Sequence, residues 1–106
     1  MGQVVKKNAD FLRLVLSTPS RVQRASLLKT VTPNQLLALG TIATNLLQGS
    51  LPLTSNYKKK LKRHRTIIRI IADKKVSLKR RKQALQPKVV VLLLQAVDPV
   101  LRSILK

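Results

Sequence analysis

The sequence contains no cysteine, no tryptophan and only three acidic residues, and these absences exclude several classes of protein. Without cysteine there is neither a disulfide framework nor a thiolate zinc site, so we expect an intracellular or particle-enclosed location. Three aspartates and one histidine are too few for an acid–base pair or a metal cage, so we expect no enzyme activity, metal, cofactor or small-molecule substrate. Phe11 and Tyr57 are the two aromatic residues, too few to stack the bases of a single strand.

Long hydrophobic runs are also absent. The longest, residues 89–94, is far shorter than the roughly 20 residues that span a bilayer, and Lys6, Lys7 and Asp10 interrupt any signal-peptide core near the start. We therefore expect a chain that is soluble or peripheral to a membrane. Its 106 residues suit one domain, and its 44% hydrophobic content exceeds that of a disordered basic tail.

Positive charge dominates what is present. The 22 lysines and arginines and three aspartates give a formal net charge of +19 at pH 7. Residues 58–82 contain 13 of these basic residues and one acid, Asp73. Because solvated helix faces usually mix both signs of charge, a cluster of one sign predicts a polyanionic partner, and nucleic acid is the obvious one.

Helix-start signals divide the chain into short units. The clearest is residues 32–35 (TPNQ), where threonine and glutamine fit a capping box and proline fits the first turn. Gly49 stands where a left-handed C-terminal residue is expected, so we predict a buried helix over 33–48. Gly40 within it lowers the helix propensity and indicates a close approach of another helix. Further units are expected to begin near Asn8, Thr18, Thr54 or Ser55, and Ser77.

These units predict an all-α fold, a compact bundle of five or six short helices with a basic amphipathic helix over 55–74. We divide the chain into a helical basic domain, residues 1–86, and a hydrophobic C-terminal tail, residues 87–106. The β-branched residues of the tail permit a strand, but no partner strand is signalled elsewhere, so a buried helix interrupted near Pro99 is favoured. The apolar stretch that begins at Val89 and ends at Leu105 either completes the core or contacts another copy of the chain.

In the 55–74 helix an apolar stripe that includes Tyr57 and His64 runs beside a basic stripe at the same spacing, rotated by about 100°. A second basic turn follows Ser77. No set of base-reading side chains accompanies these residues, so we expect contacts to phosphates that do not depend on base sequence. The candidate nucleic-acid-binding residues are Lys58, Lys59, Lys62, Arg63, Arg65, Arg69, Lys79, Arg80, Arg81 and Lys82.

Four segments occur in order between about residues 27 and 86: TPNQLLAL (32–39), LLQGSLPL (46–53), YKKKL (57–61) and VSLKRRK (76–82). Together they resemble a small basic protein family of Maverick/Polinton-type transposable elements and adintovirus-like DNA viruses. The resemblance implies a virion- or genome-associated protein of a double-stranded DNA element, whose basic helix and turn touch DNA in the virion interior or the host nucleus. Members of that family continue with a Gly-rich apolar tail, whereas this chain continues with QPK and a Val/Leu run.

The function expected is therefore non-specific binding of double-stranded DNA, in a genome-condensing or virion core protein. Two alternatives stay open. In the first alternative the chain is a structural protein, such as a capsid-lining or minor virion component, whose basic surface docks an acidic protein and whose tail contacts a capsid or another copy. The second alternative is an RNA- or ribosome-associated protein. Sequence-specific binding by a helix-turn-helix is disfavoured, because the turn over 49–54 is longer than that motif allows.

Overall fold

The computed structural model describes residues 2–49, 51 and 53–104, and within them the chain is helical apart from its turns. The all-α prediction is confirmed. The described residues form nine helices rather than five or six, because an additional helix precedes Asn8 and breaks at His64 and Val97 divide longer apolar patterns. The helices are α1 (Gln3–Lys7), α2 (Ala9–Ser17), α3 (Arg21–Lys29), α4 (Pro33–Leu47), α5 (Ser55–Arg63), α6 (Arg65–Ala72), α7 (Leu78–Gln83), α8 (Pro87–Ala96) and α9 (Asp98–Ile104).

Side-chain caps determine where several of these helices begin. At the start of α4 the Thr32 hydroxyl accepts from the Gln35 N–H at 3.1 Å, and the Gln35 side chain accepts from the Thr32 N–H at 2.9 Å, which is the predicted capping box. Thr54 caps α5 and Ser77 caps α7, as two of the helix-start signals predicted. After α4 the chain turns at Gly49, whose φ of 69° is left-handed. Asn8, in contrast, makes no side-chain cap, and its amide nitrogen donates to the Val4 carbonyl at 2.7 Å.

The core lies between α4 and α8. The side chains of Leu39 and Ile42 on α4 and of Val89 and Leu93 on α8 are fully buried. α8 packs against α2, α3, α4 and α5, so the stretch beginning at Val89 completes the core of the preceding helices. Its buried side chains face these helices, and the end of the stretch, at Leu105, lies outside the described residues. The predicted interruption near Pro99 occurs at Val97, between α8 and α9.

The helix predicted over 55–74 is divided at His64. This residue has φ −111° and ψ 18°, outside the helical region, and its N–H donates to the Leu61 carbonyl three residues back. The break allows α5 to contact α8 while α6 packs along α4. Since neither proline nor glycine marks the position, the local pattern predicts one continuous helix, and the two packing partners explain why there are two.

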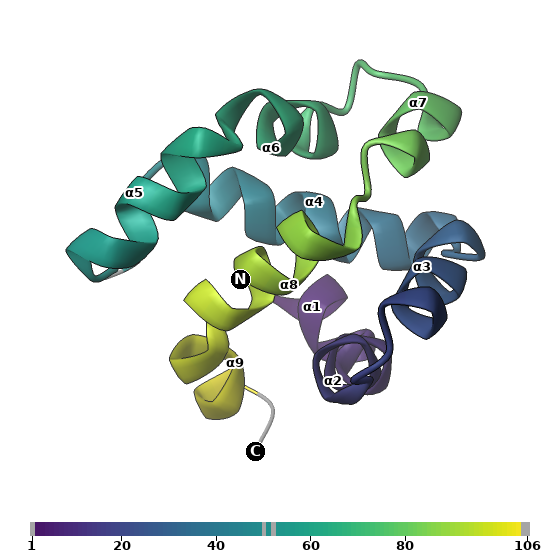
Figure 1. Cartoon of the computed structure of the whole chain (residues 1–106), viewed down its shortest axis with the longest axis horizontal. Helices are drawn as coiled ribbons and strands as arrows, with labels where there is room; N and C mark the ends of the chain where they lie inside the picture. The colour runs from purple at the N-terminus through teal and green to yellow at the C-terminus, as the bar shows by residue number, and fades with distance from the viewer. Residues whose placement is uncertain (1, 50, 52, 105–106) are drawn as a thin grey trace.

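The basic helices occupy one edge of the molecule. In Figure 1, α5, α6 and α7 follow one another along this edge, with α4 beneath them. α2 and α9 lie on the other side of α4, and α8 crosses between the two sides (Figure 1). The bundle therefore presents the segment with the highest charge density as a single layer.

Candidate nucleic-acid interface

α5 carries positive charge around most of its circumference. Leu61 is buried and Tyr57 is half-buried, and these two residues, one turn apart, form the line along which α5 docks. The lysine at position 60 places its Nζ 5.7 Å from the centroid of the Tyr57 ring, a cation–π contact. The candidate residues on this helix are all exposed, namely Lys58, Lys59, Lys62 and Arg63.

α6 adds two exposed arginines to this layer. Arg65 and Arg69 lie one turn apart on its outer side, while Ile68 and Ile71 are buried toward α4. A helix with this arrangement docks through its isoleucines and leaves both guanidinium groups in solvent. A guanidinium presents N–H donors in a fork that suits phosphate oxygens.

α7 contributes a second group of cations at the far end of the layer. Lys79 and Arg80 are exposed, and Lys82 is half-buried. Lys79 and Lys82 line a groove together with Lys29 of α3, which packs against α7. Sequence reasoning missed Lys29, because only the tertiary contact between α3 and α7 brings it to this group and no local spacing signals it.

Arg81 is not on this surface, which corrects its assignment as a phosphate contact. Its side chain is only 5% exposed, and its Nε and Nη2 donate to the Ile71 carbonyl at 3.2 and 3.1 Å. That carbonyl lies in the last turn of α6, where helix carbonyls lack intrahelical partners and carry partial negative charge. Arg81 thus joins α7 to the C-terminal end of α6.

Gly40 makes room for this contact. A Cβ built at Gly40 would lie 2.8 Å from Nη2 of Arg81 and 3.1 Å from the Ile71 carbonyl oxygen. The close approach predicted at Gly40 is present, but its partners are an arginine side chain and a helix-terminal carbonyl. Any larger residue here must displace one of them.

The acidic residues do not neutralise the basic layer. Among the described residues the two ion pairs are Arg13–Asp10 on α2 at 3.8 Å and Arg102–Asp98 on α9 at 3.0 Å, both on the other side of α4 (Figure 1). Asp73 accepts the Lys75 backbone N–H at 2.9 Å, in the turn that follows α6. The exposed cations of α5, α6 and α7 therefore face solvent with no ion pair to a described acid.

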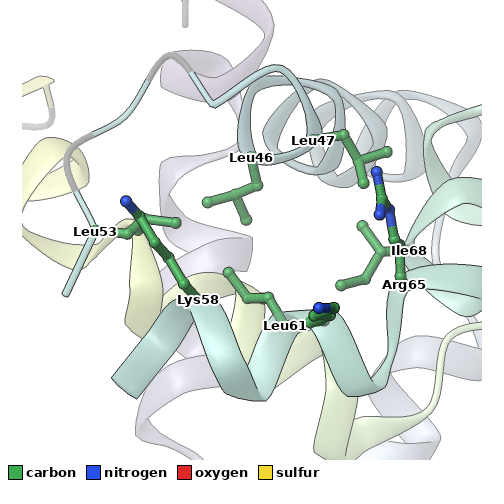
Figure 2. A pocket seen from close by; sticks show the side chains of 8 residues that line it. Leu46, Leu47, Leu53, Lys58, Leu61, Arg65 and Ile68 are labelled. Atoms are coloured by element: carbon green, nitrogen blue, oxygen red, sulfur yellow. The ribbon is translucent and has the colours of Figure 1, made fainter. Parts of the chain in front are cut away.

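Three of the candidate residues surround an apolar groove where α4, α5 and α6 meet. Lys58, Lys62 and Arg65 form its rim, and the buried side chains of Leu46, Leu61 and Ile68 form its floor, in a volume of about 170 Å³. Figure 2 shows Lys58 beside Leu53 at one end of this groove and Arg65 beside Leu47 at the other. The break at His64 creates this arrangement, because it lets α5 and α6 both border the end of α4.

The described part of the chain contains no group of three metal-ligating side chains, and none of its helices is both long and apolar enough to cross a membrane. His64 is half-buried at the junction of α5 and α6, the boundary position that its place in the apolar stripe predicts. No family model, curated protein or solved structure matches the chain. The basis for a functional proposal is thus the fold and its distribution of charge.

Proposed function

We propose that this protein binds double-stranded DNA without base specificity and acts, with no catalytic activity, as a genome-condensing or virion core protein. The observation that carries the proposal is the layer of exposed cations on α5, α6 and α7, with which no described acid forms an ion pair. Such a layer is electrostatically unfavourable by itself and becomes favourable when phosphates approach. The virion interior or a host nucleus is the setting that supplies DNA at the required concentration.

The dimensions of the protein suit several simultaneous phosphate contacts. Its principal extents are 31 × 31 × 27 Å. A duplex of that length carries roughly 18 phosphates, about half of them on each strand, at one charge per 1.7 Å. Eight of the ten candidate residues are exposed and available for them. Each contact releases condensed counterions, so the affinity should fall steeply with salt whatever the base sequence.

Two separated groups of cations suit condensation better than simple coating. One group surrounds the groove at the C-terminal end of α4, and the other lies between α3 and α7 toward the opposite end of α4 (Figure 1). The 15 residues of α4 correspond to about 22 Å of helix. One molecule that holds a different duplex at each end would draw the two duplexes together.

Fluorescence anisotropy tests the proposal. Labelled duplexes of two unrelated sequences and an RNA hairpin are titrated with the protein at several salt concentrations between about 50 and 200 mM. We expect equal affinity for both duplexes, and a log–log salt slope that becomes shallower by about three when Lys62, Arg65 and Arg69 are all replaced by Gln. The control replaces Lys6, Lys7 and Arg13 by Gln, which removes the same charge from α1 and α2.

The alternatives have their own outcomes. Tighter binding of the hairpin than of either duplex would favour an RNA-associated protein. Weak binding of every nucleic acid at moderate salt would reject the proposal and would leave the basic layer as a docking surface for an acidic protein. A slope that changes equally in the triple variant of α5 and α6 and in its control would show that net charge, rather than this layer, governs binding.

A further inference from the structure

The groove bordered by α4, α5 and α6 is not explained by phosphate binding. Its floor consists of Leu46, Leu61 and Ile68, and Leu47 and Leu53 form its walls. Leu47 is 38% exposed, so the apolar lining reaches solvent. DNA phosphates gain nothing from such a surface, whereas an apolar group loses contact with water when it enters.

The rim of the groove specifies the charge of its occupant. Lys58, Lys62 and Arg65 come from three successive turns of the α5–α6 segment and are all exposed. Figure 2 places Lys58 at one end of the groove and Arg65 at the other, so negative charge is favoured on both sides of whatever fills it. An occupant with one apolar group between acidic groups matches this pattern.

The size of the groove separates the kinds of occupant. Its volume of about 170 Å³ is well below the roughly 300 Å³ at which small-molecule pockets begin, and it is too small for a whole acyl chain. It suits a single large side chain, as do the pockets that receive anchor residues in protein interfaces. The remaining affinity must then come from carboxylates of the occupant that contact the cations of the rim.

We propose that this groove binds an acidic segment of a partner protein, with one Phe or Leu side chain inserted between Leu47 and Leu61 and carboxylates flanking it on Lys58, Lys62 and Arg65. Because the rim residues also belong to the DNA-binding layer, the segment and DNA compete for them. The site would link release of the protein from DNA to capture by an acidic partner. Binding of the segment itself does not depend on the proposed DNA function.

Two synthetic peptides test this proposal in the absence of DNA. Both are short, labelled and rich in Asp and Glu, and they differ only in a central Phe or Ala. We expect the intact protein to bind the Phe peptide about tenfold or more tightly, because the ring is buried only in that complex. Equal binding of the two peptides at every salt concentration would overturn the proposal, since charge alone would then account for it.

Substitutions in α4 locate the site. Leu47→Gln removes one apolar wall without changing charge, and it should reduce the preference for Phe to less than about threefold while leaving the salt slope for DNA unchanged. Leu37→Gln is the matched control, because Leu37 lies on the same helix, is also 38% exposed and does not line this groove. If Leu37→Gln removes the preference for the Phe peptide and Leu47→Gln does not, the groove is excluded as the binding site of the peptide.

Two further measurements separate this proposal from others. Dodecanoate offers an anionic group on an alkyl chain. If the protein binds dodecanoate, loses that binding in Leu47→Gln and does not prefer the Phe peptide to the Ala peptide, the proposal is overturned in favour of a lipid ligand. A protein that shows the Phe preference but binds no duplex would support the groove and reject the DNA proposal. A protein that binds duplex but shows no preference for the Phe peptide would support the DNA proposal and reject the groove as a peptide site.

Discussion

The central helices α4 and α8 and the outer helices α5, α6 and α7 have opposite compositions. α4 contains no charged residue and α8 contains only Lys88, whereas the three outer helices contain eleven lysines and arginines and no acid. Burial of a central leucine contributes several kcal/mol, while one exposed pair of like charges opposes folding by only a few tenths. The buried centre therefore supplies the stability that offsets an outer layer whose charged residues are all cationic.

Two residues join these regions. Arg81 is the one basic residue of the outer helices that is buried, and Gly40 is the position on α4 that leaves space for it. The outer layer is thus attached by the apolar side chains of α5 and α6 and by a guanidinium–carbonyl contact, while its other cations are exposed except for the half-buried Lys82. Substitutions in the centre, at the junction and in the layer should therefore differ in size and in kind.

The largest effect is expected from Leu93→Ala in α8. Leu93 is fully buried, so its truncation should lower the free energy of unfolding by about 3 kcal/mol, through lost burial and a residual cavity. Urea denaturation followed by circular dichroism measures this. Leu78→Ala, at a side chain 47% exposed, is the control and should change stability by less than about 0.5 kcal/mol. Unchanged stability with altered self-association would instead show that α8 faces a partner.

Arg81→Ala should lower the free energy of unfolding by about 2 kcal/mol. The substitution removes two hydrogen bonds from a charged donor and leaves the Ile71 carbonyl without that partner. Arg80→Ala, at the exposed neighbouring position, should change stability by less than about 0.5 kcal/mol.

The same pair of variants separates structure from binding. Arg80→Ala should make the salt slope for DNA shallower by about one, whereas Arg81→Ala should leave it nearly unchanged. The comparison is made at a temperature where both variants are folded. A shallower slope for Arg81→Ala alone would place this guanidinium on the phosphates after all.

Gly40→Ala should have effects of different size in two backgrounds. Alanine favours a helix by about 1 kcal/mol over glycine, but here its Cβ would lie 2.8 Å from the Arg81 Nη2, so the guanidinium must move. We expect the free energy of unfolding to fall by about 1 kcal/mol in the natural sequence and by less in the Arg81→Ala background, where only the 3.1 Å approach to the Ile71 carbonyl oxygen remains. Urea denaturation of the four proteins gives the coupling energy, and equal effects in both backgrounds would show that Gly40 and Arg81 do not interact.

The sequence predicts the parts of the fold that local chemistry specifies. The capping box at Thr32 and the left-handed Gly49 define α4 to within a residue, because both act within one turn of the helix end. The apolar tail is correctly predicted as a buried, interrupted helix, since no other strand was available to pair with it. Such features need only neighbouring residues.

Apart from the close approach at Gly40, features that depend on distant contacts were not predicted. His64 breaks the basic helix because α5 and α6 pack on different partners, and no local signal precedes the break. Arg81 has the same basic neighbours as Arg80, yet the fold buries one and exposes the other. The groove, likewise, exists only where α4, α5 and α6 meet. Which cations are exposed is therefore a property of tertiary packing.

The smallest effect is expected in the outer layer itself, from Lys59→Glu. Lys59 and Arg63 are exposed and one turn apart on α5, so the substitution replaces repulsion by an attractive pair in the favourable order. Stability should rise by about 0.3 kcal/mol at low salt. The DNA salt slope should become shallower by at least about one, because a phosphate contact is replaced by a repelling charge. Thermal unfolding at low and high salt, with Lys59→Gln as the neutral control, measures the gain in stability. This gain should vanish at high salt because the pair is exposed. Lower stability together with unchanged DNA binding would mean that the positive charge of this layer serves the fold rather than a polyanion.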